Sequence, residues 1–491
     1  MINVLLTNSY FYRFDQKQWR FKQPYPPLAT LIAASVLRTN GYNVDLFDAS
    51  LSNDPEKITH HFQLHRPKYL FICDDGFNYL TKMCLTVMRE AAFQMCKLAK
   101  KVGCTVIVSS SDAADHYEKY FAAGADFVIR GEVENTIIEL LDAIEKRKDI
   151  GQVSGVIFKQ SGKTVTGAPR SVMRDLDSLP LPAWDLIDIN AYKQIWKKHH
   201  GYFSLNVATT RGCPFKCNWC AKPIYGNRYN SRSPENVVNE IEYVLKNYQP
   251  DHFWMCDDIF GLKPGWIQEF NALVRKRNLH FRFKIQSRAD LLLESDTIQA
   301  LASSGAETVW IGAESGSQKI LDAMEKGTTV EQIHEATALL RRNNIKIAFF
   351  LQFGYPGETL EDIQATMAMV MKLMPDEVGI SISYPLPGTK FYENVKLQLR
   401  EKQNWNDSDD LDMMFQSTFN RKYYRDLHQY VHTIYRKKKG LLALKKLVQD
   451  PLTTTRKDIR TGLSTLYFFP KSISQKWKLK KSKETITENV L

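Results

Sequence analysis

The stretch 204-SLNVATTRGCPFKCNWC-220 decides how this chain folds and which chemistry it can perform. It starts as an apolar run, which predicts a buried strand, and continues into a loop with a C-x3-C-x2-C pattern formed by Cys213, Cys217 and Cys220. Thiolates are soft ligands, and three of them can hold three irons of a 4Fe–4S cluster. A structural zinc ion needs a fourth ligand, and no further Cys or His follows at short spacing. We therefore expect a 4Fe–4S cluster whose fourth iron has no protein ligand.

This pattern, with Trp219 directly before the last cysteine, resembles the signature of the radical SAM family. The resemblance implies that the open iron chelates the amino and carboxylate groups of S-adenosylmethionine (SAM), and that Trp219 belongs to the cofactor site. It also implies that one electron cleaves SAM to a 5′-deoxyadenosyl radical. A protein reductant such as flavodoxin or ferredoxin would supply that electron.

Five further apolar runs predict strands, each followed by a helical pattern, over residues 253–255, 284–286, 308–311, 346–351 and 377–383. Together with the strand that begins at Ser204, they make six β/α units within residues 201–395. Six units form an incomplete version of the eight-unit barrel, so we expect a partial (β/α)6 barrel. Polar residues follow the carboxyl ends of these strands, where barrel enzymes place their chemistry.

The resemblance assigns cofactor-binding roles to residues at those strand ends. The assigned residues are Asp257 and Asp258 for the SAM amino group, Arg288 for its carboxylate or ribose, and Glu314 with Gly312 and Ser315 for its amino or ribose groups. Gly354 and Gly357 lie in a segment typical of cobalamin-linked members. The alternative is that the acids cap helices and that the glycines only serve turns, since a positive φ alone selects glycine. No catalytic residue is assigned beyond the cluster ligands.

Residues 1–150 alternate strands with helices over short connections, which predicts a doubly wound, Rossmann-like parallel sheet. Such sheets bind ligands at the carboxyl ends of their strands. The loops after Leu6, Phe47, Cys73 and Val108 are therefore the candidate binding edge. Helices are expected over 28–39, 80–102, 116–123 and 136–146.

The first domain resembles the cobalamin-binding domain that precedes some radical SAM domains. The resemblance rests on residues 26–49 and on residues 124–136, which include Gly131, Glu132, Glu134 and Thr136. Two features depart from that pattern: the D-x-H-x-x-G motif is absent, and 109-SSSD-112 replaces a Gly-rich turn. Serines still permit close approach of a ligand, but a carboxylate beside a phosphodiester is unfavourable. The alternative is a degenerate domain that has been kept as a scaffold.

The remaining segments are a linker over 151–200 and a C-terminal extension over 396–491 with a helical, basic pattern. The whole chain carries a net charge of +12, but residues 421–491 alone hold 18 basic and 5 acidic residues, so the body is almost neutral. Basic residues interleaved with aromatics suit an anionic membrane surface or an acidic protein. The alternative is a solvated helical face with a frayed basic end. Nucleic acid is disfavoured because no recognition motif accompanies the charge.

The N-terminus lacks a signal-peptide pattern. The sequence contains no apolar run of about 18 residues, so we expect no membrane-spanning helix. The eight cysteines match no disulfide framework, which belongs to small secreted domains. We expect a cytoplasmic protein, with peripheral membrane attachment through the tail as the alternative.

Taken together, the chain resembles the radical SAM proteins with a cobalamin (B12)-binding domain, which include the anaerobic magnesium-protoporphyrin monomethyl ester cyclase and the class B methyltransferases. The resemblance implies methylation of an unactivated carbon in a small molecule or natural-product intermediate. Radical oxidative cyclisation or rearrangement is the alternative reaction. A non-catalytic cobalamin or cluster sensor is the alternative of another class.

Overall fold

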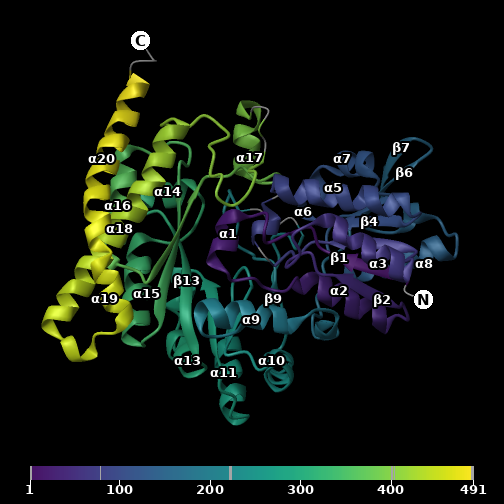
Figure 1. The fold of residues 1–491 in the computed structure, drawn as a ribbon, viewed down its shortest axis with the longest axis horizontal. Helices are drawn as coiled ribbons and strands as arrows, with labels where there is room; N and C mark the ends of the chain where they lie inside the picture. Colours follow the sequence, from purple (N-terminus) through teal and green to yellow (C-terminus); the bar gives the residue numbers. More distant parts are fainter. Residues whose placement is uncertain are drawn as a thin grey trace.

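A computed structural model describes residues 3–487 except 78, 84, 221–223, 400, 401 and 403. The chain forms two α/β units side by side, and a C-terminal helical region covers the outer flank of the second unit (Figure 1). The fold is thus the predicted one: a doubly wound sheet followed by a partial barrel.

The first unit is a seven-stranded sheet with the order β2-β1-β3-β4-β5-β6-β7. Its strands are β1 (Val4–Thr7), β2 (Val44–Phe47), β3 (Tyr69–Cys73), β4 (Thr105–Ser109), β5 (Phe127–Ile129), β6 (Val156–Gln160) and β7 (Lys163–Thr166). The first five are parallel, and the hairpin β6–β7 continues the sheet antiparallel to β5. This hairpin falls within the range expected to be a linker, so the first sheet extends to Thr166.

Helices cover both faces of this sheet because its parallel strands are apolar on both sides. One face packs on α2 (Leu28–Thr39) and α8 (Glu134–Glu145). The other packs on α3 (Ile58–His65), α5 (Thr86–Lys101) and α7 (Tyr117–Ala123). Shorter helices complete the unit: α1 (Gln16–Phe21), α4 (Tyr79–Lys82), α6 (Ser111–Asp115), and the 3-10 turns η1 (Pro55–Lys57) and η2 (Ile150–Gln152).

The prediction of a single helix over 80–102 is wrong, because the structure has two helices there, α4 and α5. Leu85 is extended and precedes α5, and the first N–H groups of α5 donate to distant carbonyls. Thr86 N–H donates to Trp405 C=O (2.9 Å) and Val87 N–H to Asn406 C=O (3.2 Å). A segment more than 300 residues later thus caps this helix, and such a contact leaves no local signal in the sequence.

The second unit is a six-stranded, fully parallel sheet with the order β15-β14-β13-β12-β11-β8. Its strands are β8 (Ser204–Val207), β11 (His252–Met255), β12 (Arg282–Ser287), β13 (Ala306–Glu314), β14 (Lys346–Phe353) and β15 (Glu377–Ile382). The helices that follow them are α10 (Pro234–Tyr248), α11 (Trp266–Lys276), α12 (Ala289–Leu292), α13 (Thr297–Ser303), α14 (Gln318–Ala323), α15 (Val330–Arg342), α16 (Leu360–Leu373) and α17 (Lys390–Val395). This is the predicted partial barrel of six β/α units.

Smaller elements connect the units. The chain enters the barrel through η3 (Trp184–Leu186) and α9 (Ile189–His200), and the cysteine loop is framed by β9 (Thr210–Arg211) and β10 (Asn230–Ser231). The C-terminal region comprises η4 (Lys396–Gln398), α18 (Arg421–Gln449), η5 (Pro451–Thr453), α19 (Arg456–Leu463) and α20 (Thr465–Thr487). In Figure 1, α20 runs along α18 at the outer edge of the barrel.

The carboxyl ends of the two sheets face each other. Lys82, after β3, pairs with Asp258 after β11 (2.6 Å), and Glu132, after β5, pairs with Arg211 after β8 (2.9 Å). Tyr384, after β15, donates its hydroxyl to Met83 C=O (2.9 Å). The edges that bind ligands in the two kinds of sheet are therefore brought to one junction.

Candidate active site at the junction of the two sheets

The cysteine loop leaves the barrel at the end of β8 and turns at Gly212. Gly212 has φ +75°, and a Cβ there would collide with the Arg228 carbonyl, so only glycine fits. Cys213 is buried, and Cys217 and Cys220 are half-buried. The structure thus places all three predicted cluster ligands on one short loop at the junction.

Asn218, between two of these cysteines, ties the loop to the barrel. Its backbone N–H donates to Met324 C=O (3.0 Å), and its side-chain amide donates to Ala323 C=O (2.7 Å). Tyr355 donates its hydroxyl to the Asn218 side-chain oxygen (2.8 Å). The loop is therefore held by the end of α14 and by the turn after β14.

Cationic side chains surround the sulfurs. Arg288 Nη1 lies 4.0 Å from Cys217 Sγ, and its guanidinium stacks on the Phe215 ring at 3.7 Å. Burial opposes the charge of Lys326, but Glu314 and Cys217 together raise its pKa. Burial likewise opposes the charge of Lys82, and Asp258 and Cys220 raise its pKa. Each cation is also paired with a carboxylate: Arg288 with Asp290 (2.9 Å), Lys326 with Glu314 (2.9 Å) and Lys82 with Asp258 (2.6 Å). The sulfurs therefore lie beside three ion pairs.

Glu314 is buried at the end of β13 and pairs with Lys326 Nζ (2.9 Å). It adopts φ +56°, and the strand register shifts between Gly312 and Glu314. A non-glycine residue held in this region is strained, and such strain concentrates at functional sites. A Cβ at Gly312 would lie 2.6 Å from Lys326 Nζ and 2.8 Å from Glu314 Oε1, so glycine leaves room for the pair.

Lys326 also lies 5.9 Å from the centre of the Trp219 ring. The Trp219 indole N–H is buried and has no hydrogen-bond partner among the described residues. A buried donor without a partner is costly. Trp219, Glu314, Lys326 and Arg288 therefore form a polar rim around the cysteine loop.

The two predicted acids after β11 have different partners. Asp257 is buried and accepts from Thr209 N–H (2.7 Å), Thr209 hydroxyl (2.6 Å) and Thr210 N–H (2.8 Å), while burial raises its pKa to about 6. Asp257 thus holds the segment that leads into the cysteine loop. Asp258 is half-buried and pairs with Lys82 of the first unit.

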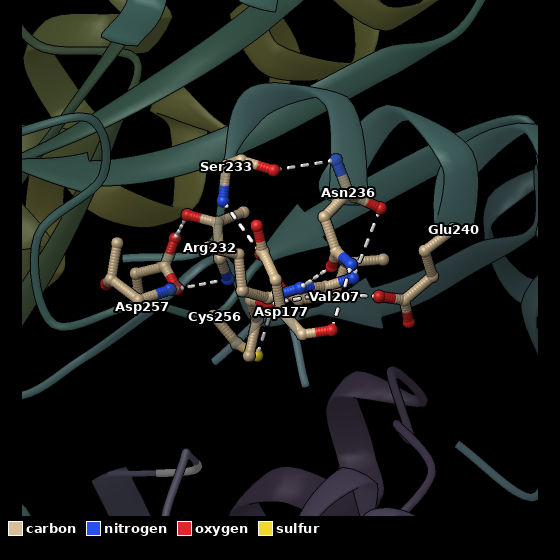
Figure 2. A network of polar contacts seen from close by, with 11 residues as sticks. Asp177, Val207, Arg232, Ser233, Asn236, Glu240, Cys256 and Asp257 are labelled. Atoms are coloured by element: carbon tan, nitrogen blue, oxygen red, sulfur yellow. Dashed lines mark hydrogen bonds and ion pairs between the residues drawn. The ribbon is translucent and has the colours of Figure 1, made fainter. Parts of the chain in front are cut away.

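Figure 2 shows how a polar network anchors the same segment from its other side. Arg232 donates to Ala208 C=O (2.9 Å) and to Asn236 (2.7 Å), and it pairs with the buried Glu240. Cys256 is buried and donates its thiol to Val207 C=O (3.3 Å). The strand end before the cysteines is therefore fixed before any ligand binds.

The remaining predicted residues lie one layer further out. Ser315 is buried, and its hydroxyl contacts that of Thr366 on α16 (3.0 Å). Gly354 N–H donates to Glu358 Oε2 (2.7 Å), and Gly357 C=O accepts from Lys319 (3.1 Å). None of these contacts reaches the cysteines directly.

The facing edge of the first sheet is polar. Asn8 donates to Ser50 (3.1 Å), and Ser9 donates to Asp74 through its N–H (2.7 Å) and its hydroxyl (2.9 Å). Burial raises the pKa of Asp74 to about 6. The loops after β1, β2 and β3 therefore meet at one edge of the sheet, which is the candidate binding edge expected from the sequence.

The carboxylate that appeared unfavourable in the 109–112 loop is already neutralised. Asp112 is buried, pairs with Arg89 through both of its oxygens, and accepts the Tyr120 hydroxyl (2.8 Å). Ser110 caps α6 by accepting from Ala113 N–H (2.9 Å). The loop therefore presents small side chains without a free negative charge.

One face of the barrel sheet is not covered by its helices. It carries the half-buried side chains Trp254, Lys284, Gln286, Trp310 and Phe350. Trp310 and Phe350 stack with centroids 4.6 Å apart, and Lys284 Nζ lies 5.3 Å from the Trp254 ring. Tyr25 of the first unit covers part of this face, because its ring lies 4.8 Å from that of Trp254 and 5.2 Å from Lys284 Nζ. Lys284 makes no salt bridge or hydrogen bond with any residue that the structure describes, and burial lowers its pKa.

The family model of the radical SAM superfamily matches residues 207–370, which include the cysteine loop and most of the barrel. Residues 207–370 are therefore a radical SAM domain. The superfamily's 4Fe–4S cluster and SAM fit the donor set described above, because three sulfurs on one loop are ringed by cations and by polar groups at strand ends.

Sequence relatives are named as methyltransferases and cyclases. An uncharacterized methyltransferase of Pyrococcus horikoshii is 30% identical over 282 residues, which cover 57% of this chain and 60% of the relative. The anaerobic magnesium-protoporphyrin IX monomethyl ester cyclase of Synechocystis is 24% identical over 376 residues, 76% of this chain and 73% of that one.

Solved radical SAM structures share the fold. OxsB with aqua-cobalamin and SAM bound has a TM-score of 0.72 at 17% identity, covering 95% of this chain and 75% of OxsB. TsrM of Kitasatospora setae, with cobalamin and a 4Fe–4S cluster bound, has a TM-score of 0.67 at 19% identity, covering 81% of this chain and 75% of TsrM. The arrangement of a Rossmann-like unit before the radical SAM barrel is thus a known one.

Sequence reasoning missed three residues of this radical SAM site: Asn218, Lys326 and Lys82. Asn218 stood inside the quoted motif, but only its contacts reveal its anchoring role. Lys326 lies in a short connection after α14, and nothing in its neighbourhood distinguishes it from a solvated lysine. Lys82 belongs to the first unit, so its place beside Asp258 depends on how the two units dock.

Proposed function

We propose that this protein is a cobalamin-dependent radical SAM enzyme that methylates an unactivated carbon of a small molecule. One observation carries the proposal: the cysteine loop and the polar edge of a Rossmann-like sheet face each other across one junction. When bound, the cluster and SAM would supply a carbon-centred radical, and cobalamin would supply the methyl group.

The protein's own residues bind and orient these groups. Cys213, Cys217 and Cys220 would hold the cluster, and Arg288 with Lys326 lowers the electrostatic cost of its negative charge. Glu314 and Asp258 offer carboxylates to the SAM amino group, and Arg288 offers a cation to its carboxylate. The loops after β1 to β4 would hold cobalamin, with Ser109, Ser110 and Ser111 in place of a Gly-rich turn.

The first experiment tests the cluster. Anaerobic reconstitution should give a 4Fe–4S absorption band that is lost in Cys213→Ala, Cys217→Ala or Cys220→Ala. Cys256→Ala is the matched control, because Cys256 is buried beneath the site and donates to a backbone carbonyl. A cluster that persists in the triple variant would end the proposal.

The second experiment tests cobalamin. Incubation of the reconstituted enzyme with hydroxocobalamin, followed by gel filtration, should leave a stoichiometric base-off spectrum, because no residue of a D-x-H-x-x-G motif is present to coordinate cobalt. Failure to retain the corrinoid would instead favour a first unit that serves only as a scaffold.

The named cyclase relatives favour a second reaction, oxidative cyclisation or rearrangement, at the same site. Reductive incubation with labelled SAM separates the two. S-adenosylhomocysteine formed together with 5′-deoxyadenosine indicates methylation, whereas 5′-deoxyadenosine alone indicates cyclisation or rearrangement. An intact cluster that cleaves no SAM with either flavodoxin or ferredoxin as reductant would indicate a sensor.

The uncovered barrel face indicates the substrate class. It offers Lys284, which has no salt bridge among the described residues and lies between the rings of Tyr25 and Trp254, with Trp310 and Phe350 on the same face. We expect a substrate that combines an apolar body with an anionic group. Protoporphyrin IX, followed by quenching of tryptophan fluorescence, should bind more tightly than its dimethyl ester, and Lys284→Met should remove that difference.

The C-terminal helix α20 suggests attachment to an anionic lipid surface. Its fully buried side chains are polar, namely Thr465, Ser472, Gln475 and Ser482, whereas several of its exposed side chains are large and apolar. Leu466 is 79% exposed and Trp477 72% exposed, and Phe469 and Ile473 lie on the same stripe at helical spacing. A helix with apolar residues outward and lysines beside them matches an interfacial membrane helix. No helix among the described residues is long and apolar enough to span a bilayer.

Vesicle sedimentation tests this attachment. The protein should bind phosphatidylglycerol vesicles but not phosphatidylcholine vesicles, and Trp477→Ser should weaken binding. The control is Trp254→Phe, which leaves α20 unchanged. Equal sedimentation of Trp477→Ser and wild type would exclude lipid insertion of α20 and would favour an acidic protein as the partner of the lysines.

A further inference from the structure

Three metal-ligating side chains converge on the first sheet, outside the site described above. Asp45 is the second residue of β2, the edge strand, and it points to the face that α3 covers. His61 and His65 are four residues apart on α3, so their side chains share one side of that helix.

The donor atoms meet within the reach of a single ion. His61 Nδ1 lies 2.6 Å and His65 Nε2 lies 3.2 Å from the same Asp45 oxygen, Oδ2. The three donor atoms all lie within 4.8 Å of one another. Phe47 packs edge-on against the His61 ring with centroids 5.6 Å apart and helps to fix that ring.

The three side chains are only partly buried. The exposed fraction is 23% for Asp45, 25% for His61 and 29% for His65. An ion can therefore enter from solvent, and water can fill the coordination positions that the protein leaves open. If the three side chains were fully buried, an ion could not reach them from solvent. If they were fully exposed, their rotamers would not be fixed by packing.

We propose that Asp45, His61 and His65 bind a divalent transition metal ion of the zinc class. Two imidazoles and one carboxylate, with an open position for water, form a ligand set that suits Zn²⁺ and its neighbours. Binding replaces the His61 hydrogen bond and the His65 contact on Asp45 Oδ2 by bonds to the ion. The ring proton on each donor nitrogen moves to the other ring nitrogen or is released to solvent, since a ligating histidine must present a lone pair.

The place of this site in the fold assigns it a structural role. Asp45 lies at the start of β2, away from the carboxyl edge where the loops meet the barrel. The ion would fix α3 to β2, which is an edge strand of the first sheet. An exposed edge strand can pair with strands of other chains, so holding α3 beside β2 would protect this edge. This site is independent of the proposed reaction at the junction.

Equilibrium dialysis of the cluster-loaded enzyme against ZnCl₂, followed by elemental analysis of zinc and iron, tests the proposal. Iron content reports the cluster, so zinc bound by vacant cysteines is recognised separately. The wild type should hold one more equivalent of zinc than Asp45→Asn, His61→Gln or His65→Gln at unchanged iron content. His60→Gln is the matched control, because His60 is exposed on the same helix and does not contact Asp45.

A second measurement guards against variants that fold poorly. Zinc should raise the thermal midpoint of the wild type and of His60→Gln by about 2–4 °C, and should leave that of His61→Gln and His65→Gln unchanged. Equal zinc content in wild type and His61→Gln, or equal midpoint shifts, would overturn the proposal and leave the trio as a hydrogen-bonded cluster only.

Discussion

At the scale of single residues, the site depends on buried charges that are paired. Glu314 and Lys326 illustrate this, because each is buried and each compensates the other. Removing one partner of such a pair leaves the other charge desolvated, which is more costly than never having built the pair.

Lys326→Gln should therefore weaken SAM binding by about 10–100-fold, the cost of losing a hydrogen bond to a charged group. Cluster content should change little, because the three cysteines remain. Equilibrium dialysis with labelled SAM and an iron assay on the same sample measure both. Lys319→Gln, an exposed lysine on the neighbouring α14 turn, is the control, and equal loss of SAM in both variants would contradict the role of Lys326.

Glu358 gives a residue-scale prediction on pH. Burial raises the pKa of its carboxyl from an ordinary value of 4.5 to about 8, against the opposing hydrogen bond from Gly354 N–H. Between these values the folded state keeps a proton that the unfolded state has released, so stability is highest at low pH and is lost as the pH rises towards 8.

The thermal midpoint of the wild type should consequently fall between pH 6.5 and 8.5, by the equivalent of roughly 1–3 kcal/mol. Glu358→Gln should flatten this slope, since the amide mimics the protonated acid. The buried aspartates with a pKa near 6, such as Asp74 and Asp257, titrate mostly below this window. An unchanged slope in Glu358→Gln would show that other groups cause it.

At the scale of elements, the sequence predicted most strands and the order of units correctly, because each parallel strand is a short apolar run between turn residues. The helix over 28–39 was predicted to the residue. The split of the 80–102 helix was not predictable, because the carbonyls of Trp405 and Asn406 cause it from far along the chain. The hairpin β6–β7 lies within the segment predicted to be a linker, and its pairing with β5 is a tertiary contact that no local pattern announces.

The same division applies to the site. The three cluster ligands could be predicted from the spacing of the cysteines alone. Glu314 and Arg288 could be predicted because they stand at the ends of predicted strands and match the motifs of the family that the chain resembles. The pairing of Asp258 with Lys82, and that of Arg211 with Glu132, could not be predicted, because each joins residues from two separately folded sheets.

The tail also differs from a frayed basic end. Helix α18 packs against β15 and α16, and α20 packs along α18. The helices come close together at Gly440 of α18, where a Cβ would collide with the Thr465 hydroxyl and lie 3.0 Å from Thr461 C=O. A larger side chain at this point would separate the helices.

We expect Gly440→Leu to release α19 and α20 from α18, which should create new trypsin cleavage sites after the lysines of α20. SAM cleavage should persist, as it should in a chain that lacks residues 455–491, because no contact described for α19 or α20 reaches the junction. Leu441→Ala, an exposed neighbour, is the control for proteolysis. Loss of SAM cleavage at full cluster content would contradict this separation.

At the scale of the whole molecule, a buried ion triad joins the two units. Arg211 of the barrel pairs with Glu132 (2.9 Å) and Glu134 (2.5 Å) of the first unit, and all three side chains are about 5% exposed or less. Glu132 and Glu134 belong to the segment that resembles a cobalamin-binding domain. In the structure both pair with Arg211, which lies two residues before the cluster ligand Cys213.

Arg211→Met should leave two carboxylates buried without a cation and destabilise the docked state by about 3–5 kcal/mol. Differential scanning calorimetry should show separate transitions for the two units in this variant. Arg38→Met removes the exposed Arg38–Asp185 pair and should cost less than about 1 kcal/mol. A single unshifted transition in Arg211→Met would show that the triad does not control docking.

The contact of residues 404–408 with the first unit has a consequence for biosynthesis. The ribosome releases the first sheet long before Trp405 and Ser408, yet Ser408 bonds to Asp15 and Trp405 caps α5. The first sheet can therefore fold while residues 404–408 are still missing from the nascent chain. Maturation factors that deliver iron, sulfide or a corrinoid would meet the junction at that stage, before the late segment fastens the two halves together.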